Sequence, residues 1–289
     1  MTAKILAMLL VYLLVLSTQL SAADDADKYV EDLKDPDANV RWAAASTLGS
    51  LGDRKAVDPL TIALKDGDFR VRQAAAWSLG ELGDAKAAGA LIQTLQTRDY
   101  YPSYEEDRMM PQENQLRATA TEALGKLNSS SAVDPLIQAL LDEESSVRAA
   151  AAESLGRQND PKVVEPLILA LKEDSYQVRT NALWSLQKIN DTRATEPLIL
   201  SLMDEDARVR LAAAKILGDL GDDRAVSSLI RALNDEDAEV RAAAAEALGK
   251  LGDVRAVDPL EEALNDESAA VKLRATWALE KLGVPPSSQ

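Results

Sequence analysis

The sequence predicts an all-α fold, an α-solenoid built from eight copies of one two-helix repeat. A Val-Arg step recurs every 31 residues, and a single interval of 45 residues, between Val71 and Leu116, equals 31 plus 14. A fixed period of this length is typical of solenoids, in which each unit buries its apolar face only against its neighbours. The first residue of the step is Val40, Val71, Leu116, Val147, Val178, Val209, Val240 and Val271, with Lys272 in place of Arg in the last copy.

Residues 1–23 differ from the repeats and predict a signal peptide. Lys4 gives a positive start, residues 5–16 are an unbroken apolar run, and Ser21-Ala22-Ala23 resembles a signal-peptidase site. The run is short for a bilayer span, which needs about 20 residues. Counting back 31 residues from Asp53 reaches Ala22, so the first repeat begins where the cleavage site ends. We therefore expect an exported chain, secreted or in the cell envelope; the alternative is an uncleaved membrane anchor.

The second helix of each repeat has the clearer pattern. Val240, Ala244, Leu248 and Leu251 form one apolar stripe at helical spacing. A residue suited to the start of a helix stands four positions before each Arg of the step, where Asp and Ser are good N-caps and acidic residues favour the positive helix end. These residues are Asp37, Asp68, Glu113, Glu144, Ser175, Asp206, Asp237 and Ser268.

The end of the second helix is marked by a column that contains only Gly and Asn, which predicts a positive φ just past a helix. The column comprises Gly52, Gly83, Asn128, Asn159, Asn190, Gly221, Gly252 and Gly283. An Asp or Ser usually follows and caps the first helix of the next repeat. That first helix carries a recurrent proline, such as Pro59, which marks either its start or a bend.

The 14 extra residues lie in the third repeat. Residues 97–112 replace the short turn between its two helices, and we expect a loop there. The loop holds Tyr100, Tyr101 and Tyr104, which either contact a partner or pack back on the array. The single array of repeats then spans residues 24–283, and residues 284–289 are a C-terminal tail.

The motif Asp-x-Arg-Ala-Val-Asp-Pro-Leu-x-x-Ala-Leu resembles the short HEAT repeats of the phycobilin-lyase type. It is also similar to the consensus of artificial α-helicoidal repeat proteins, and the resemblance covers residues 22–283. The resemblance implies a right-handed superhelix whose second helices line the concave face. The family includes lyases, assembly factors and plain binding proteins, so it implies the fold more strongly than the function.

Composition excludes several classes of function. The chain has 48 acidic and 32 basic residues, a formal charge of −16, which argues against nucleic-acid binding. It has no Cys and no His, which excludes Cys/His zinc sites, thiol nucleophiles and Ser-His-Asp triads. The iron-dependent hydroxylases that resemble HEAT proteins are excluded by the lack of His. We predict no catalytic residue, no metal and no cofactor.

The arginines of the Val-Arg step predict a structural ladder. We expect them to pair with carboxylates of the turns, such as Asp35, Asp66, Asp142, Asp204 and Asp235, because charged side chains are almost never buried unless paired. The resemblance implies that the ladder joins adjacent repeats; the alternative is anion binding. The ladder comprises Arg41, Arg72, Arg117, Arg148, Arg179, Arg210 and Arg241.

Candidate binding residues lie in the columns of the second helix that vary from repeat to repeat. All four tryptophans fall there and none in the core columns. Aromatic and Arg residues on an exposed face are usual anchors of a binding surface; alternatively, each Trp covers the seam between adjacent second helices. The candidates are Trp42, Gln73, Trp77, Glu122, Glu153, Asn181, Trp184, Lys215, Glu246, Arg274 and Trp277.

The sequence therefore predicts a non-enzymatic interaction scaffold that holds a protein or peptide on the concave face. One alternative is a phycobilin-lyase-like or other modifying enzyme or assembly factor, and another is a structural component of an envelope complex. The polar last repeat, with Lys272, Arg274, Glu280 and Lys281, predicts a monomer.

Overall fold

The computed structural model describes the backbone of residues 26–97 and 103–284 and the side chains of residues 26–97 and 111–284. The chain divides into two compact units, unit 1 (Met1–Ser154) and unit 2 (Leu155–Gln289). All regular structure in the described ranges is helical, and no helix in them is long and apolar enough to span a membrane. The predicted signal peptide, Tyr100, Tyr101 and the side chain of Tyr104 lie outside the described residues.

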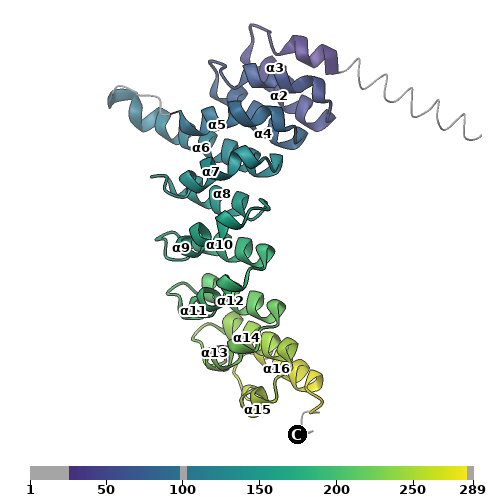
Figure 1. Ribbon diagram of the computed structural model, residues 1–289, viewed down its shortest axis with the longest axis vertical. Helices are drawn as coiled ribbons and strands as arrows, with labels where there is room; N and C mark the ends of the chain where they lie inside the picture. Colours follow the sequence, from purple (N-terminus) through teal and green to yellow (C-terminus); the bar gives the residue numbers. More distant parts are fainter. Residues whose placement is uncertain (1–25, 98–102, 285–289) are drawn as a thin grey trace, which may run out of the picture. The chain divides into compact units, whose positions relative to one another are not determined.

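Unit 1 contains the first four repeats, each a first helix, a turn and a longer second helix (Figure 1). Residues 26–32 are the described part of the first helix of repeat 1. The other first helices are α3 (Val57–Ala63), α5 (Ala88–Gln96) and α7 (Val133–Ala139). The second helices are α2 (Ala38–Leu51), α4 (Phe69–Leu82), α6 (Ser103–Leu127) and α8 (Ser145–Leu155).

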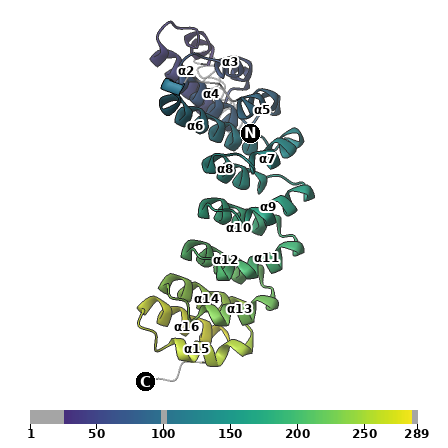
Figure 2. The same cartoon turned by 90° about the vertical axis from the view of Figure 1, so that its left-hand side faces the viewer.

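Unit 2 contains the other four repeats, and its helices form two layers (Figure 2). One layer consists of the first helices α9 (Val164–Ala170), α11 (Thr195–Leu200), α13 (Val226–Ala232) and α15 (Val257–Ala263). The other consists of the second helices α10 (Tyr176–Ile189), α12 (Ala207–Leu220), α14 (Ala238–Leu251) and α16 (Ala269–Lys281). The predicted all-α solenoid is confirmed in both units.

The recurrent proline marks the start of the first helix and not a bend, because a short 3₁₀ turn precedes the first helices. The turns are η1 (Arg54–Ala56), η2 (Ala85–Ala87), η3 (Ser130–Ala132), η4 (Pro161–Val163), η5 (Thr192–Ala194), η7 (Asp223–Ala225) and η8 (Val254–Ala256), while η6 (Ser201–Met203) follows α11. In repeat 2, Asp53 caps η1 and α3 then begins at Val57, so Pro59 stands in the first helical turn. A proline is tolerated there because the first N–H groups of a helix lack intrahelical partners.

The predicted N-caps of the second helices are confirmed at four positions, where the Asp side chain accepts a backbone N–H from the first helical turn. These are Asp37, Asp68, Asp206 and Asp237. Ser175 and Ser268 stand at the cap position but make no capping hydrogen bond. Glu113 is not a cap, because α6 begins ten residues earlier, at Ser103.

The Gly/Asn column has the predicted positive φ in seven of its eight members. Asn159 is the exception, because α8 already ends at Leu155, four residues earlier, whereas the other second helices end one or two residues before the Gly or Asn. Gln158 replaces the leucine of the apolar stripe in this repeat, and its side chain is buried. A helix that continued would place a polar amide in the apolar stripe, which is consistent with the early end.

The insertion in repeat 3 is not a loop throughout. From Ser103 onward it lengthens the second helix, so α6 runs over 25 residues and contains Pro111. The prediction of a loop over residues 97–112 is therefore wrong for its C-terminal part. The physical reason is that each residue added to an existing helix contributes one further backbone hydrogen bond, with the exception of Pro111, which has no N–H to donate.

The core is formed by the predicted stripe. Its Ala column and its first Leu column, which include Ala244 and Leu248, are almost completely buried, whereas the second Leu column is half-buried at Leu251 and exposed at Leu51. The first helices add residues such as Leu60. Second helices approach closely where a Gly of one repeat meets a small residue of the next: a Cβ placed on Gly218 would lie 2.7 Å from the Cα of Ala247. Gln187 and the buried Ile216 replace this pair between α10 and α12. A larger pair requires a wider separation of the two helices.

Candidate functional site

The ladder arginines join consecutive repeats. Arg210 of α12 donates from Nε and Nη2 to the two carboxylate oxygens of Asp235, at 2.7 and 2.8 Å, in the turn of the next repeat. Its Nη1 donates to the backbone carbonyls of Asp204 and Glu205 in its own turn, at 2.9 and 3.2 Å. The same arrangement joins Arg41 to Asp66, Arg179 to Asp204 and Arg241 to Asp266. Each arginine therefore closes one turn and binds the next.

This arrangement is built from local sequence. The carboxylate that receives the arginine also accepts the backbone N–H two residues later, as Asp235 does from Asp237 at 2.9 Å. Two nearly buried groups are thus fixed from three sides, with side-chain exposures of 8% for Arg210 and 10% for Asp235. Planar guanidinium groups suit such bidentate contacts, which explains why Arg fills the column.

The electrostatics of the ladder favour ionised carboxylates. Burial opposes ionisation of Asp235, but hydrogen bonds from Arg210 and from the Asp237 N–H outweigh it and lower its pKa. At Asp66 and Asp266 the hydrogen bonds from their arginines are the largest influence and lower the pKa. Asp206, hydrogen-bonded mainly by Arg208, has its pKa lowered to about 2.

Repeat 3 lacks the usual turn carboxylate of the ladder, and a residue of another element takes its place. The residue 25 positions after Arg72 is Thr97, where the other repeats have the turn carboxylate. Glu113, in the lengthened α6, bonds to Arg72 instead, and both side chains are largely buried. Glu113 is therefore a member of the ladder that sequence reasoning assigned to capping. The sequence does contain a signal for this role, because Thr97 occupies a position that is acidic in the other repeats and so leaves Arg72 without its usual partner.

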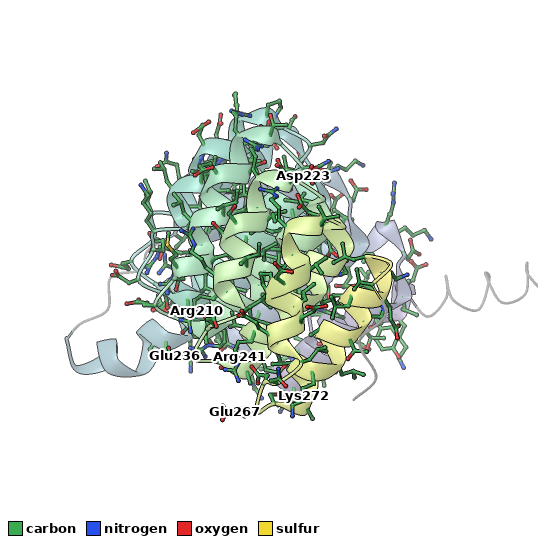
Figure 3. All side chains as sticks on the ribbon, turned by 90° about the horizontal axis from the view of Figure 1, so that it is seen from below. Arg210, Asp223, Glu236, Arg241, Glu267 and Lys272 are labelled. Carbon is green, nitrogen blue, oxygen red and sulfur yellow. The ribbon has the colours of Figure 1, made fainter. Side chains whose placement is uncertain are left out.

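The turns also carry outward-facing acids. In unit 2 Arg210, Glu236, Arg241 and Glu267 lie along one edge, whereas Asp223, before α13, lies elsewhere (Figure 3). Glu236 and Glu267 approach the guanidinium groups of Arg210 and Arg241 at 3.3 and 3.5 Å but remain strongly exposed. Exposed pairs of this kind contribute little to stability. No group of three or more acidic side chains within the described residues is arranged to hold a metal ion.

The predicted binding residues lie on the face of the second helices that points away from the core stripe, here named the second-helix face. Trp42, Trp77 and Trp184 are 46%, 41% and 38% exposed. In unit 1 the face comprises Trp42, Gln73, Trp77, Glu122 and Glu153, and in unit 2 it comprises Asn181, Trp184, Lys215, Glu246, Arg274 and Trp277. All eleven side chains are exposed or half-buried, and none is in the core.

Some members of this face are brought together. Glu246 pairs with Arg274 at 3.2 Å and with Lys250 at 3.1 Å, and Lys250 also reaches Asp219 at 2.8 Å. Trp277 covers the seam between α14 and α16, because its ring lies against the position where a Cβ of Gly249 would stand. Lys215 makes no ion pair with any residue that the structure describes. Apart from Lys215, the charged members of the face in unit 2 thus form ion pairs within the protein.

Two aromatic residues of the turns have structural contacts. The guanidinium of Arg208 stacks on the ring of Tyr176, 3.3 Å from its centroid, and that of Arg72 lies 5.9 Å from the ring centroid of Phe69. Cation–π contacts of this kind hold the rings against the repeat array.

Comparison with solved structures reports related folds. YibA of Escherichia coli is 21% identical over 89% of this chain and 92% of that chain, with a TM-score of 0.61. The complex of CpcE and CpcF of phycocyanin lyase from Nostoc sp. PCC7120 is 26% identical over 78% of this chain and 86% of that chain, with a TM-score of 0.48. Human deoxyhypusine hydroxylase in complex with glycerol is 23% identical over 92% and 98%, with a TM-score of 0.41. These likenesses concern the fold and leave open whether this chain is an enzyme.

No curated protein matches the chain. The family model for HEAT repeats matches residues 26–102, 111–187, 133–204 and 195–280, which together cover most of the sequence. The chain belongs to the HEAT repeat family.

Proposed function

We propose that the chain is an exported, non-enzymatic scaffold that holds a protein or peptide on its second-helix face. The observation that carries the proposal is the exposure of three indole rings, those of Trp42, Trp77 and Trp184, on a face whose other members are mostly small, polar or charged residues. The core between repeats consists mainly of Val, Ala and Leu, and the Arg ladder joins the turns, so stacking does not require these three rings. Large aromatic side chains on an exposed face are typical of binding hot spots.

The non-enzymatic part of the proposal is supported by the sequence. With neither Cys nor His, the chain lacks the usual nucleophile–base pairs, and the carboxylates of the ladder are bound by arginine. Export is supported by residues 1–23 alone.

The proposal is tested by crosslinking mass spectrometry of the full chain in its native host. Trp77→Ala and Trp184→Ala, separately and together, remove anchors from unit 1 and unit 2. Leu169→Ala and Leu200→Ala are matched controls, because these leucines are even more exposed than the tryptophans but lie on first helices. We expect the tryptophan variants to lose the crosslinked partner while the helical circular dichroism is unchanged and the controls retain it. A partner that is retained by both tryptophan variants would exclude the second-helix face.

A further inference from the structure

Unit 1 contains a cavity of about 1000 Å³ that the second-helix face does not include. It lies between the first helices of repeats 1, 2 and 3 and residues of the second helices α4 and α6. Its lining includes Leu33, Ile62, Ala90 and Leu116. This volume is at the upper end of the range for small-molecule sites.

The cavity forms where repeat 3 departs from the repeat pattern. Gly89 and Ala90 stand where repeat 2 has Asp58-Pro59 and where most other repeats also have an acid followed by proline. A Cβ added at Gly89 would meet no atom within 4 Å. Gly89 therefore contributes no side chain to this wall, and the space beside it is open.

The walls of the cavity are largely apolar, and the threonine hydroxyls among them already donate hydrogen bonds within the protein. Ile62, which is 75% exposed, and Leu33 offer aliphatic surface. The hydroxyls of Thr61 and Thr94 also line it, and they donate to carbonyls of their own helices at 2.8 and 3.1 Å. A threonine whose hydroxyl already donates in this way can offer a ligand only its methyl group and the acceptor lone pairs of its oxygen.

The charge of the lining is opposite to that of the chain. Its described charged residues are Lys34, Lys65, Arg72, Asp66 and Glu113, three cations against two carboxylates, in a chain of net charge −16. Arg41 holds Asp66 and Arg72 holds Glu113, so both carboxylates are already neutralised. Lys34 pairs with Glu31 in an exposed position.

Lys65 is the cation that remains available at the cavity. It is exposed and makes no ion pair with any residue in the described ranges. Within the described lining, an anionic group placed beside Lys65 would meet only Asp66 and Glu113 as acids, and both are bound by arginine.

We propose that this cavity binds a small amphipathic organic anion. The apolar body of the ligand lies against Leu33, Ile62 and Leu116, and its anionic group faces the ammonium of Lys65. A medium-chain carboxylate is the simplest member of this class. The proposal is independent of partner binding, because none of the residues that define the second-helix face lines the cavity.

The test is isothermal titration calorimetry of the full chain with decanoate, with decanol as the neutral probe of the same chain length. We expect Lys65→Glu to weaken decanoate binding about tenfold, since it replaces an attraction by a repulsion of similar size. The double variant Ala90→Leu with Thr94→Leu fills the cavity and should abolish binding. Lys172→Glu is the matched control, because Lys172 occupies the same column in repeat 5 and is exposed, and it should bind like the unmodified chain.

Circular dichroism and thermal unfolding establish that each variant is folded. The proposal is overturned if decanoate does not bind, if decanol binds as tightly as decanoate, or if Lys172→Glu weakens binding as much as Lys65→Glu. It is also overturned if the cavity-filling variant binds normally. That result would place binding elsewhere, for example on the apolar residues 5–16 that every variant shares.

Discussion

Replacement of Arg210 by Met tests the ladder most sharply. The substitution keeps an aliphatic side chain of similar length but removes the bidentate contact to Asp235 and two hydrogen bonds to the carbonyls of Asp204 and Glu205. Among the described hydrogen bonds to the Asp235 carboxylate, only that from the Asp237 N–H then remains, and the side chain is 10% exposed. Removal of one partner from such a buried pair costs about 3–5 kcal/mol.

The assay is urea unfolding followed by circular dichroism. Lys215→Met is the matched control in the same helix, because Lys215 is exposed and makes no ion pair with any residue that the structure describes, so we expect little change. The double variant Arg210→Met with Asp235→Asn removes the uncompensated charge and should recover part of the loss. If Arg210→Met unfolds at the same urea concentration as Lys215→Met, the ladder does not hold the repeats together and the reasoning is refuted.

Three further predictions follow from the same contacts. The pKa of Asp206 is lowered from 3.8 to about 2, so its contribution to stability is complete above about pH 4 and is lost as the pH falls toward 2; the urea midpoint should decline in that window, and a midpoint that stays constant would contradict the assignment. Gly80→Ala should destabilise unit 1 by about 1–3 kcal/mol, because the added Cβ would lie 2.9 Å from the Cα of Ala123, whereas Gly89→Ala, in open space, should stabilise it by about 0.5–1 kcal/mol; equal thermal shifts would argue against close helix packing. Glu113→Gln should lower the unfolding free energy by about 1–3 kcal/mol by leaving Arg72 without its carboxylate, and Thr97→Asp should restore part of it in urea unfolding; no rescue would mean that the two positions are not equivalent.

The regular parts of the fold could be predicted from the sequence because each depends on local chemistry. The backbone at position 252 has a positive φ, which favours Gly, and the free N–H groups at the start of α14 favour a capping residue such as Asp237. Both effects depend only on residues a few positions away. The apolar stripe that includes Leu248 depends only on helical periodicity.

The departures could not be predicted because they depend on other repeats or on competition between two local signals. Glu113 has the composition of a cap, but the residue that decides its role is Thr97, whose missing carboxylate leaves Arg72 to be satisfied. Asn159 has the right chemistry for a positive φ, yet the helix before it ends early at Leu155. The cavity beside Gly89 arises from side chains missing in one repeat, which only the packing of three repeats reveals.

The central claim is that the constant columns build the scaffold and the exposed tryptophans bind the partner. The most direct measurement is crosslinking mass spectrometry in the native host with the full chain and its double variant Trp77→Ala with Trp184→Ala. The account predicts that crosslinks of the unmodified chain map to the second helices, such as Lys215 on α12, and that the double variant loses them while its circular dichroism is unchanged. Crosslinks that persist in the double variant, or that map to the first helices, would contradict it.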